Sequence, residues 1–233
     1  GDAGYVGLGQ RYRRPADLPP RIPVFPLRGA ILLPRATLPL NIFEPRYLTM
    51  IDDVMASNRV LGILQPTASA EDAGMESPEG KSFGLHKVGC AGRITSYKEL
   101  DDGRYVITLT GVARFEIVGE AETDKPYRIV SASYDRFAAD FTEGLGEERV
   151  DRENLLRVLK AYLEANQLKT DWSAVTRASN EFLINALSVM SPYSSEEKQA
   201  LLEAVDLKTR AEVLVALAEI ELASSGGNGS TLQ

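Results

Sequence analysis

The spacing of apolar residues changes once along this chain of 233 residues, near Phe137. Before that residue, short segments alternate apolar and polar side chains or form brief apolar runs, which is typical of β-strands. After it, apolar residues recur every three or four positions, as on one face of an α-helix. A run of strands followed by a run of helices predicts an α+β fold.

The first half is predicted to be a small, closed or nearly closed antiparallel barrel with one early helix. Proline is favoured at the first helical position, so Pro45 predicts a helix that ends near Ser57. The sequence Asp-Asp-Gly at 101–103 predicts a hairpin. We expect Gly111 to break the strand that follows. The expected strands are 22–27, 38–42, 60–65, 87–99, 104–110, 114–119 and 127–137.

The strand at 22–27 carries Pro23 and Pro26. Proline has no N–H to donate to a β-ladder, so we expect an edge strand or a strand interrupted by bulges. The residues before it are rich in Gly, Pro and Arg and predict a flexible basic arm.

The second half predicts a bundle of four helices. Helical spacing covers 147–166 and 172–190, and Ser194 with Glu197 forms a capping box at the start of a third helix. A fourth helix is expected to end near Ser224. The expected divisions are a flexible arm at 1–20, a barrel at 21–137, a helical bundle at 138–224 and a flexible Gly/Ser tail at 225–233.

The formal net charge of −7 is unevenly distributed. Residues 1–137 hold 17 basic and 17 acidic residues, whereas 138–233 hold 9 basic and 16 acidic ones. The acidic surplus therefore belongs to the helical half, and an acidic chain is not expected to bind nucleic acid in general.

Composition provides little for catalysis. One Cys and one His cannot form a zinc site of the usual composition, and Cys90 is expected to be a buried core thiol. The sequence at 74–82 resembles a phosphate-binding loop but has five residues between its glycines instead of four, so we expect a mobile loop. We therefore expect no metal, no cofactor and no enzymatic activity. No apolar run is long enough for a transmembrane helix and no secretory signal is evident, so a cytoplasmic location is expected.

Several segments together resemble the N-terminal, substrate-binding domain of the ATP-dependent Lon protease family. They are 22–28, 33–34, 38–47, 88–94, 109–115 and 197–203. The resemblance implies a pseudo-barrel related to RNA-binding PUA folds, a helical bundle, and recognition of unfolded or tagged polypeptides for a hexameric protease. No ATPase or peptidase module follows Ser224, so we expect a free-standing, non-catalytic adaptor or chaperone-like protein, a monomer or weak dimer, that has a Lon-type protease as a partner.

An apolar, proline-interrupted segment followed by an arginine-containing helix start offers a sheet edge to an extended peptide. The alternative is that the same apolar side chains simply seal the barrel. RNA binding through the barrel, and a small-molecule site in the barrel mouth or between the two halves, are further alternatives. The candidate peptide-binding residues are Phe25, Leu27, Arg28, Phe43, Arg46 and Tyr47.

Overall fold

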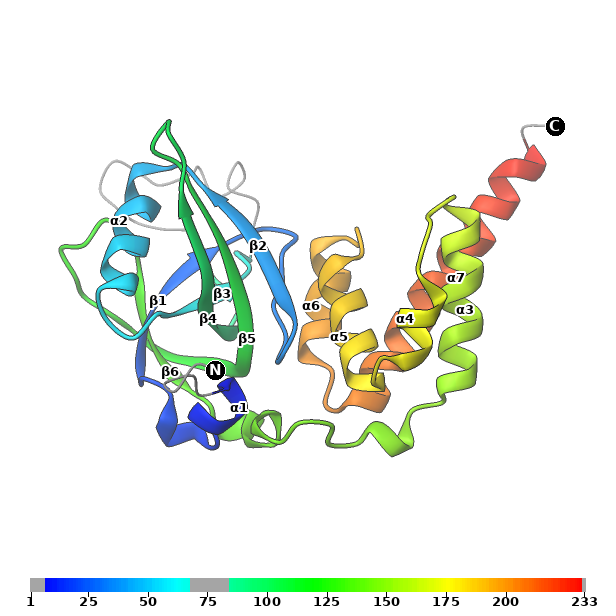
Figure 1. Cartoon of the computed structure of the whole chain (residues 1–233), viewed down its shortest axis with the longest axis horizontal. Coiled ribbons are helices and arrows are strands. Elements are labelled where there is room, and N and C mark those ends of the chain that lie inside the picture. Colours follow the sequence, from blue (N-terminus) through cyan, green and yellow to red (C-terminus); the bar gives the residue numbers. More distant parts are fainter. Residues whose placement is uncertain (1–6, 68–83, 232–233) are drawn as a thin grey trace.

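The computed structural model describes residues 7–67 and 84–231, and it confirms the α+β class. Figure 1 shows a strand-rich half beside a helical half. The six-stranded sheet has the order β2-β5-β4-β3-β1-β6, and β5 also pairs with β6, so the sheet closes on itself. The strands are β1 (Arg21–Pro26), β2 (Thr37–Ile42), β3 (Val60–Leu64), β4 (Val88–Glu99), β5 (Tyr105–Ala121) and β6 (Ile129–Ser133).

Strand β1 departs from expectation in two ways. It pairs in parallel with β3, so the sheet is mixed and the prediction of an antiparallel barrel is wrong at this pair. It also lies between β3 and β6, not at an edge. Its prolines are tolerated because each half pairs on one side: 21–23 with β6 and 24–26 with β3.

Strand β5 continues through Gly111, where a break was expected. A Cβ atom at this position would lie 1.9 Å from the carbonyl oxygen of Leu33. The Gly111 carbonyl accepts from the N–H of Arg35 at 2.8 Å, and its own N–H donates to the Ala36 carbonyl at 2.8 Å. Glycine here permits a close crossing of two backbones instead of ending a strand. The last strand is also shorter than expected, because the 3₁₀ helix η2 (Asp135–Phe141) replaces its end.

Helix α2 (Pro45–Met55) matches the expected early helix and buries Tyr47, Met50, Ile51 and Val54. Two tyrosines attach it to the barrel. The Tyr105 hydroxyl donates to Asp52 at 2.7 Å, and the Tyr127 hydroxyl donates to Asp53 at 2.5 Å.

Five α-helices, not four, lie in the described part of the second half. The expected helix at 172–190 is divided because the Ser179 hydroxyl accepts from the N–H of Phe182 at 3.1 Å and starts a new helix. The capping box is confirmed, with Ser194 and Glu197 each accepting from the other's N–H at 3.2 and 2.9 Å. The last helix extends into the residues expected to be a tail. The helices are α3 (Arg152–Ala165), α4 (Trp172–Arg177), α5 (Asn180–Met190), α6 (Ser195–Glu203) and α7 (Leu207–Thr231).

Residues 7–20 are packed against the barrel, which differs from the expected flexible arm. They contain helix α1 (Leu8–Arg11) and the 3₁₀ helix η1 (Pro15–Asp17). Tyr12 and Leu18 are buried, and the Tyr12 hydroxyl accepts from Arg93 at 2.9 Å. Two large side chains in an otherwise polar stretch are enough to anchor it.

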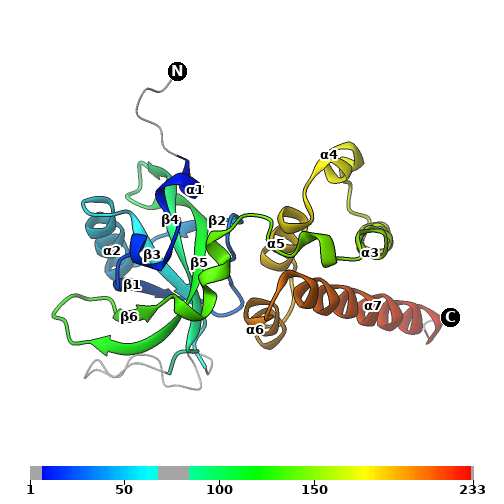
Figure 2. The ribbon, with the colours of Figure 1, turned by 90° about the horizontal axis from the view of Figure 1, so that it is seen from below.

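One of the hydrophobic clusters spans both halves. The cluster that contains Ile31, Leu32 and Leu33 of the barrel also contains Ile184 of α5 and Leu201 of α6. Figure 2 shows α5 and α6 beside the barrel, with α3 and α4 farther away. The barrel and the nearest helices therefore stabilise each other directly.

Candidate functional site

Two of the candidate residues form part of the barrel's interior. The rings of Phe25 and Tyr47 stack with centroids 4.2 Å apart and an angle of 13° between their planes. They are only 8% and 7% exposed, and burial raises the pKa of Tyr47. The stack joins β1 to α2, and in this structure neither ring is available to a partner.

The next three candidates differ in how far the fold engages them. The Arg46 guanidinium lies 4.7 Å from the centre of the Tyr47 ring, and its Nε donates to Glu44 at 3.0 Å. Leu27 is half-buried, and its N–H donates to the Leu64 carbonyl at 2.9 Å. Arg28 is exposed. Arg46 and Leu27 are thus engaged within the fold, whereas Arg28 faces solvent.

Phe43 is the aromatic candidate that the structure leaves exposed, at 63%. It directly follows β2, in which Asn41 lies opposite Val106 of β5. Because side chains alternate across a strand, Phe43, Asn41 and Val106 project to the same face. Val106 is 38% exposed. Phe43 and Val106 therefore provide apolar area on one exposed face of the sheet.

Strand β2 is also an edge strand. Within the described ranges it pairs with β5 and with no second strand, so one side of its backbone has no ladder partner. Pro39, at its centre, lacks an N–H and limits pairing with another copy of the same edge. We call β2, Phe43 and Val106 together the β2 edge surface. Sequence reasoning placed the open edge at 22–27, but the structure places it one strand later.

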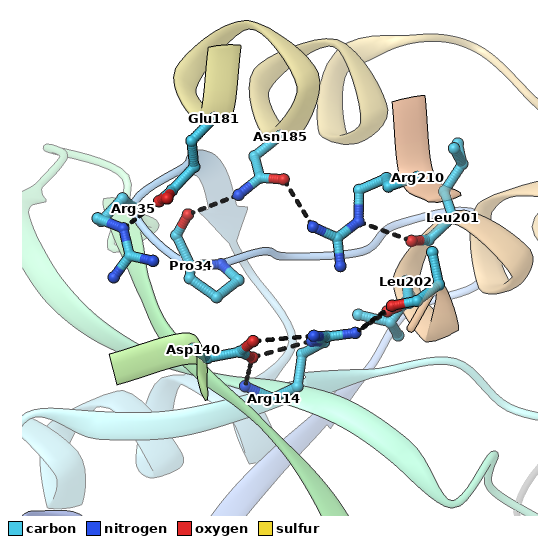
Figure 3. A network of polar contacts seen from close by, with 10 residues as sticks. Pro34, Arg35, Arg114, Asp140, Glu181, Asn185, Leu201, Leu202 and Arg210 are labelled. Carbon is cyan, nitrogen blue, oxygen red and sulfur yellow. Dashed lines mark hydrogen bonds and ion pairs between the residues drawn. The ribbon is translucent and has the colours of Figure 1, made fainter. Parts of the chain in front are cut away.

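A buried polar network joins the barrel to the helices (Figure 3). The Arg114 Nη2 and Nε atoms donate to Asp140 at 2.8 and 2.9 Å, and Nη1 donates to the carbonyls of Leu202 and Ala204 at 3.0 and 2.8 Å. The Asn185 side chain donates to the Pro34 carbonyl at 3.1 Å. Arg35 and Glu181 form an ion pair. Sequence reasoning missed these residues, although an arginine between Ala113 and Phe115 is a signal of a buried charge.

Burial makes Cys90 unsuited to nucleophilic chemistry. Cys90 is fully buried, and desolvation raises the pKa of its thiol, as does nearby Asp140 to a smaller extent. No group of three or more His, Cys, Asp or Glu in the described ranges is placed to hold a metal ion. The loop at 74–82 lies outside the described residues. None of the helices in the ranges that the structure covers has the length and apolar character that crossing a membrane requires.

Comparison with solved structures defines the class of fold. The chain is similar to a Lon N-terminal domain protein from Xanthomonas campestris, with a TM-score of 0.57, 21% identity, and coverage of 84% of this chain and 97% of that one. It is also similar to the N-terminal domain of Mycobacterium avium complex Lon protease, with a TM-score of 0.62, 19% identity, and coverage of 85% and 98%. The fold is that of Lon N-terminal domains.

The family follows from the sequence match. The family model of the ATP-dependent protease La (LON) substrate-binding domain matches residues 21–219, so the chain belongs to this family. It is 28% identical to Lon protease 2 of Myxococcus xanthus over 208 residues, which cover 86% of this chain and 24% of that protein. It is 27% identical to Lon protease of Flavobacterium johnsoniae, with 88% and 25% covered. The chain thus spans about a quarter of the length of these relatives.

Proposed function

We propose that this chain is a non-catalytic polypeptide-recognition module that holds unfolded or tagged segments, as an adaptor or chaperone-like partner of a Lon-type protease in the cytoplasm. Membership of a substrate-binding family supports recognition of polypeptide substrates. The observation that carries the proposal is the open edge of β2 beside the exposed Phe43 ring.

The β2 edge surface suits an extended chain. An unpaired strand edge binds a peptide by adding it as a further strand, with main-chain hydrogen bonds that do not depend on the peptide's sequence. Apolar side chains next to the edge then favour segments with hydrophobic residues. This combination is what recognition of varied unfolded chains requires, because main-chain bonds give generality and Phe43 gives selection for apolar segments.

The exposed area of Phe43 determines how much affinity its substitution should remove. An aromatic side chain presents roughly 200 Å², so about 130 Å² of Phe43 remains for a partner to cover. Covering half of that area stabilises a complex by about 1.5 kcal/mol, or roughly tenfold in the dissociation constant. We therefore expect Phe43→Ala to weaken binding of an unfolded polypeptide about tenfold.

Fluorescence anisotropy with a labelled, permanently unfolded polypeptide tests the proposal. Phe182→Ala is the matched control, because Phe182 is 57% exposed and belongs to α5, outside the residues that define the β2 edge surface. The control should bind like the unsubstituted chain. Equal affinities for the two variants, or no binding of the polypeptide to the unsubstituted chain, would contradict the proposal. Affinity that is insensitive to salt would further separate peptide binding from phosphate contacts with RNA.

A further inference from the structure

The barrel and the helical half enclose a cleft of about 300 Å³. Pro34 and Arg114 contribute from the barrel, Asp140 from the segment that follows it, and Asn185 and Arg210 from α5 and α7. Figure 3 shows these residues around a common space.

Arg210 is the unusual member of this lining. It is 4% exposed, and its Nε donates to the Leu201 carbonyl at 2.9 Å while Nη1 donates to the Asn185 side-chain oxygen at 2.9 Å. Its Nη2 atom is buried and has no hydrogen-bond partner among the described residues. Figure 3 shows this nitrogen pointing into the space between Pro34 and Arg114.

The carboxylates nearby are already occupied by other groups. Asp140 accepts three hydrogen bonds from Arg114, including one from its backbone N–H at 3.0 Å. Glu181 pairs with Arg35 and accepts from the N–H of Gly144 at 2.5 Å. The hydrogen-bond partners of Arg210 in the described part of the chain are therefore neutral oxygens, and a buried cation whose donors meet no carboxylate is unfavourable.

The charge on Arg210 persists at neutral pH. Burial lowers its pKa to about 9, with a further lowering by the charge of Arg114, so the guanidinium remains protonated at pH 7. Asp140 and Glu181 oppose this lowering, but neither is hydrogen-bonded to Arg210 among the described residues, so an additional negative charge in contact with Nη2 would stabilise the guanidinium.

The start of α7 also favours a bound anion. Lys208 and Arg210 lie in its first turn, which contains no acidic residue. Cations are unfavourable at a helix N-terminus, whereas anions are stabilised there. Asp206, just before the helix, supplies a carboxylate, which accepts from the N–H of Thr209 at 2.7 Å, and the Lys208 Nζ atom lies 4.0 Å from a carboxylate oxygen of Glu212. The whole cleft is lined by five basic residues (Arg35, Arg114, Arg149, Lys208 and Arg210) and four acidic ones (Asp140, Glu148, Glu181 and Asp206).

We propose that this cleft binds a small oxyanion, a phosphate or carboxylate group, through the Nη2 atom of Arg210. Lys208 and the N-terminus of α7 add favourable charge. The proposal does not depend on peptide binding at the β2 edge surface, because it rests on a different set of residues.

Thermal denaturation in sodium phosphate, sodium acetate and sodium chloride at matched ionic strength tests the proposal. At ten times the dissociation constant, the bound oxyanion should raise Tm by roughly 3–6 °C, and chloride should not. A rise with phosphate alone identifies a phosphate group as the ligand chemistry, and a rise with acetate identifies a carboxylate. No rise with either oxyanion beyond that with chloride would overturn the proposal.

Variants locate the site. Arg210→Gln should abolish the Tm rise. Because this buried substitution can also impair folding, the exposed Lys208→Gln provides a second test and should weaken binding about two- to fivefold. Lys160→Gln, at an exposed position on α3 outside the cleft, is the control and should leave binding unchanged. Equal affinities in the Lys208 and Lys160 variants would refute the assignment.

Discussion

Asp140→Asn should be among the most destabilising single charge substitutions in this protein. Among the residues that the structure describes, Asp140 is the acidic partner of Arg114, and the side chains of Asp140 and Arg114 are buried, with 9% and 5% of their surfaces exposed. Removing one member of a buried ion pair costs about 3–5 kcal/mol, because the remaining charge stays desolvated. In this site two arginines, Arg114 and Arg210, would remain without that carboxylate, so we expect the upper part of the range.

Urea denaturation followed by circular dichroism measures this effect. With a slope of about 3 kcal/mol per M, the midpoint should fall by roughly 1–1.7 M. Glu116→Gln is the matched control, because Glu116 pairs with Arg136 at 3.4 Å with both side chains substantially exposed. Such a pair contributes at most about 1 kcal/mol. If Asp140→Asn shifts the midpoint no more than Glu116→Gln, the buried network does not hold the two halves together.

Three further predictions follow from local geometry. Gly111→Ala should lower the free energy of unfolding by about 3 kcal/mol, because its Cβ would overlap a carbonyl oxygen. Gly119→Ala is the control, because its Cβ would lie 4.0 Å from the nearest atom. In the same urea assay it should change the free energy of unfolding by under about 0.5 kcal/mol. The hydrogen bond from Tyr127 is the main cause of the lowered pKa of Asp53. This hydrogen bond therefore stabilises the folded protein above about pH 4, and the stabilisation is lost as pH falls through the folded-state pKa of Asp53. Tyr127→Phe should therefore make Tm fall less steeply between pH 5 and pH 2 (roughly the range of this titration). Cys90 should not react with a thiol reagent such as Ellman's reagent in the folded protein, and one thiol per chain should react in denaturant; rapid reaction of the folded protein would contradict its burial.

Features with a local physical cause were predictable from the sequence. The apolar stripe of α2, the capping box at Ser194 and the hairpin at 101–103 each depend on residues a few positions apart. The parallel pairing of β1 with β3 has no such local signal, because it joins residues 24–26 to residues 62–64. The same holds for Gly111, whose role depends on a distant carbonyl.

The candidate site was predictable only in part. Phe43 and Phe25 are both aromatic residues in apolar segments, and sequence alone could not tell which one is buried. The stacking of Phe25 on Tyr47 decides this, and it depends on how α2 packs against β1. Arg114 lies between apolar residues, which is a signal of burial, whereas Arg210 looks like an ordinary surface cation in the sequence. A usable signal for Arg210 was its place, with Lys208, in the first turn of a helix.

Hydrogen exchange of the β2 amides tests the central claim most directly. The protein is exchanged alone and in the presence of a saturating, permanently unfolded polypeptide, and the difference is mapped along the chain. Addition of a peptide strand to the open edge should slow exchange of the β2 amides that face that edge, and Phe43→Ala should reduce this protection at the same polypeptide concentration. Protection confined to other segments, with β2 unchanged, would contradict recognition at this edge.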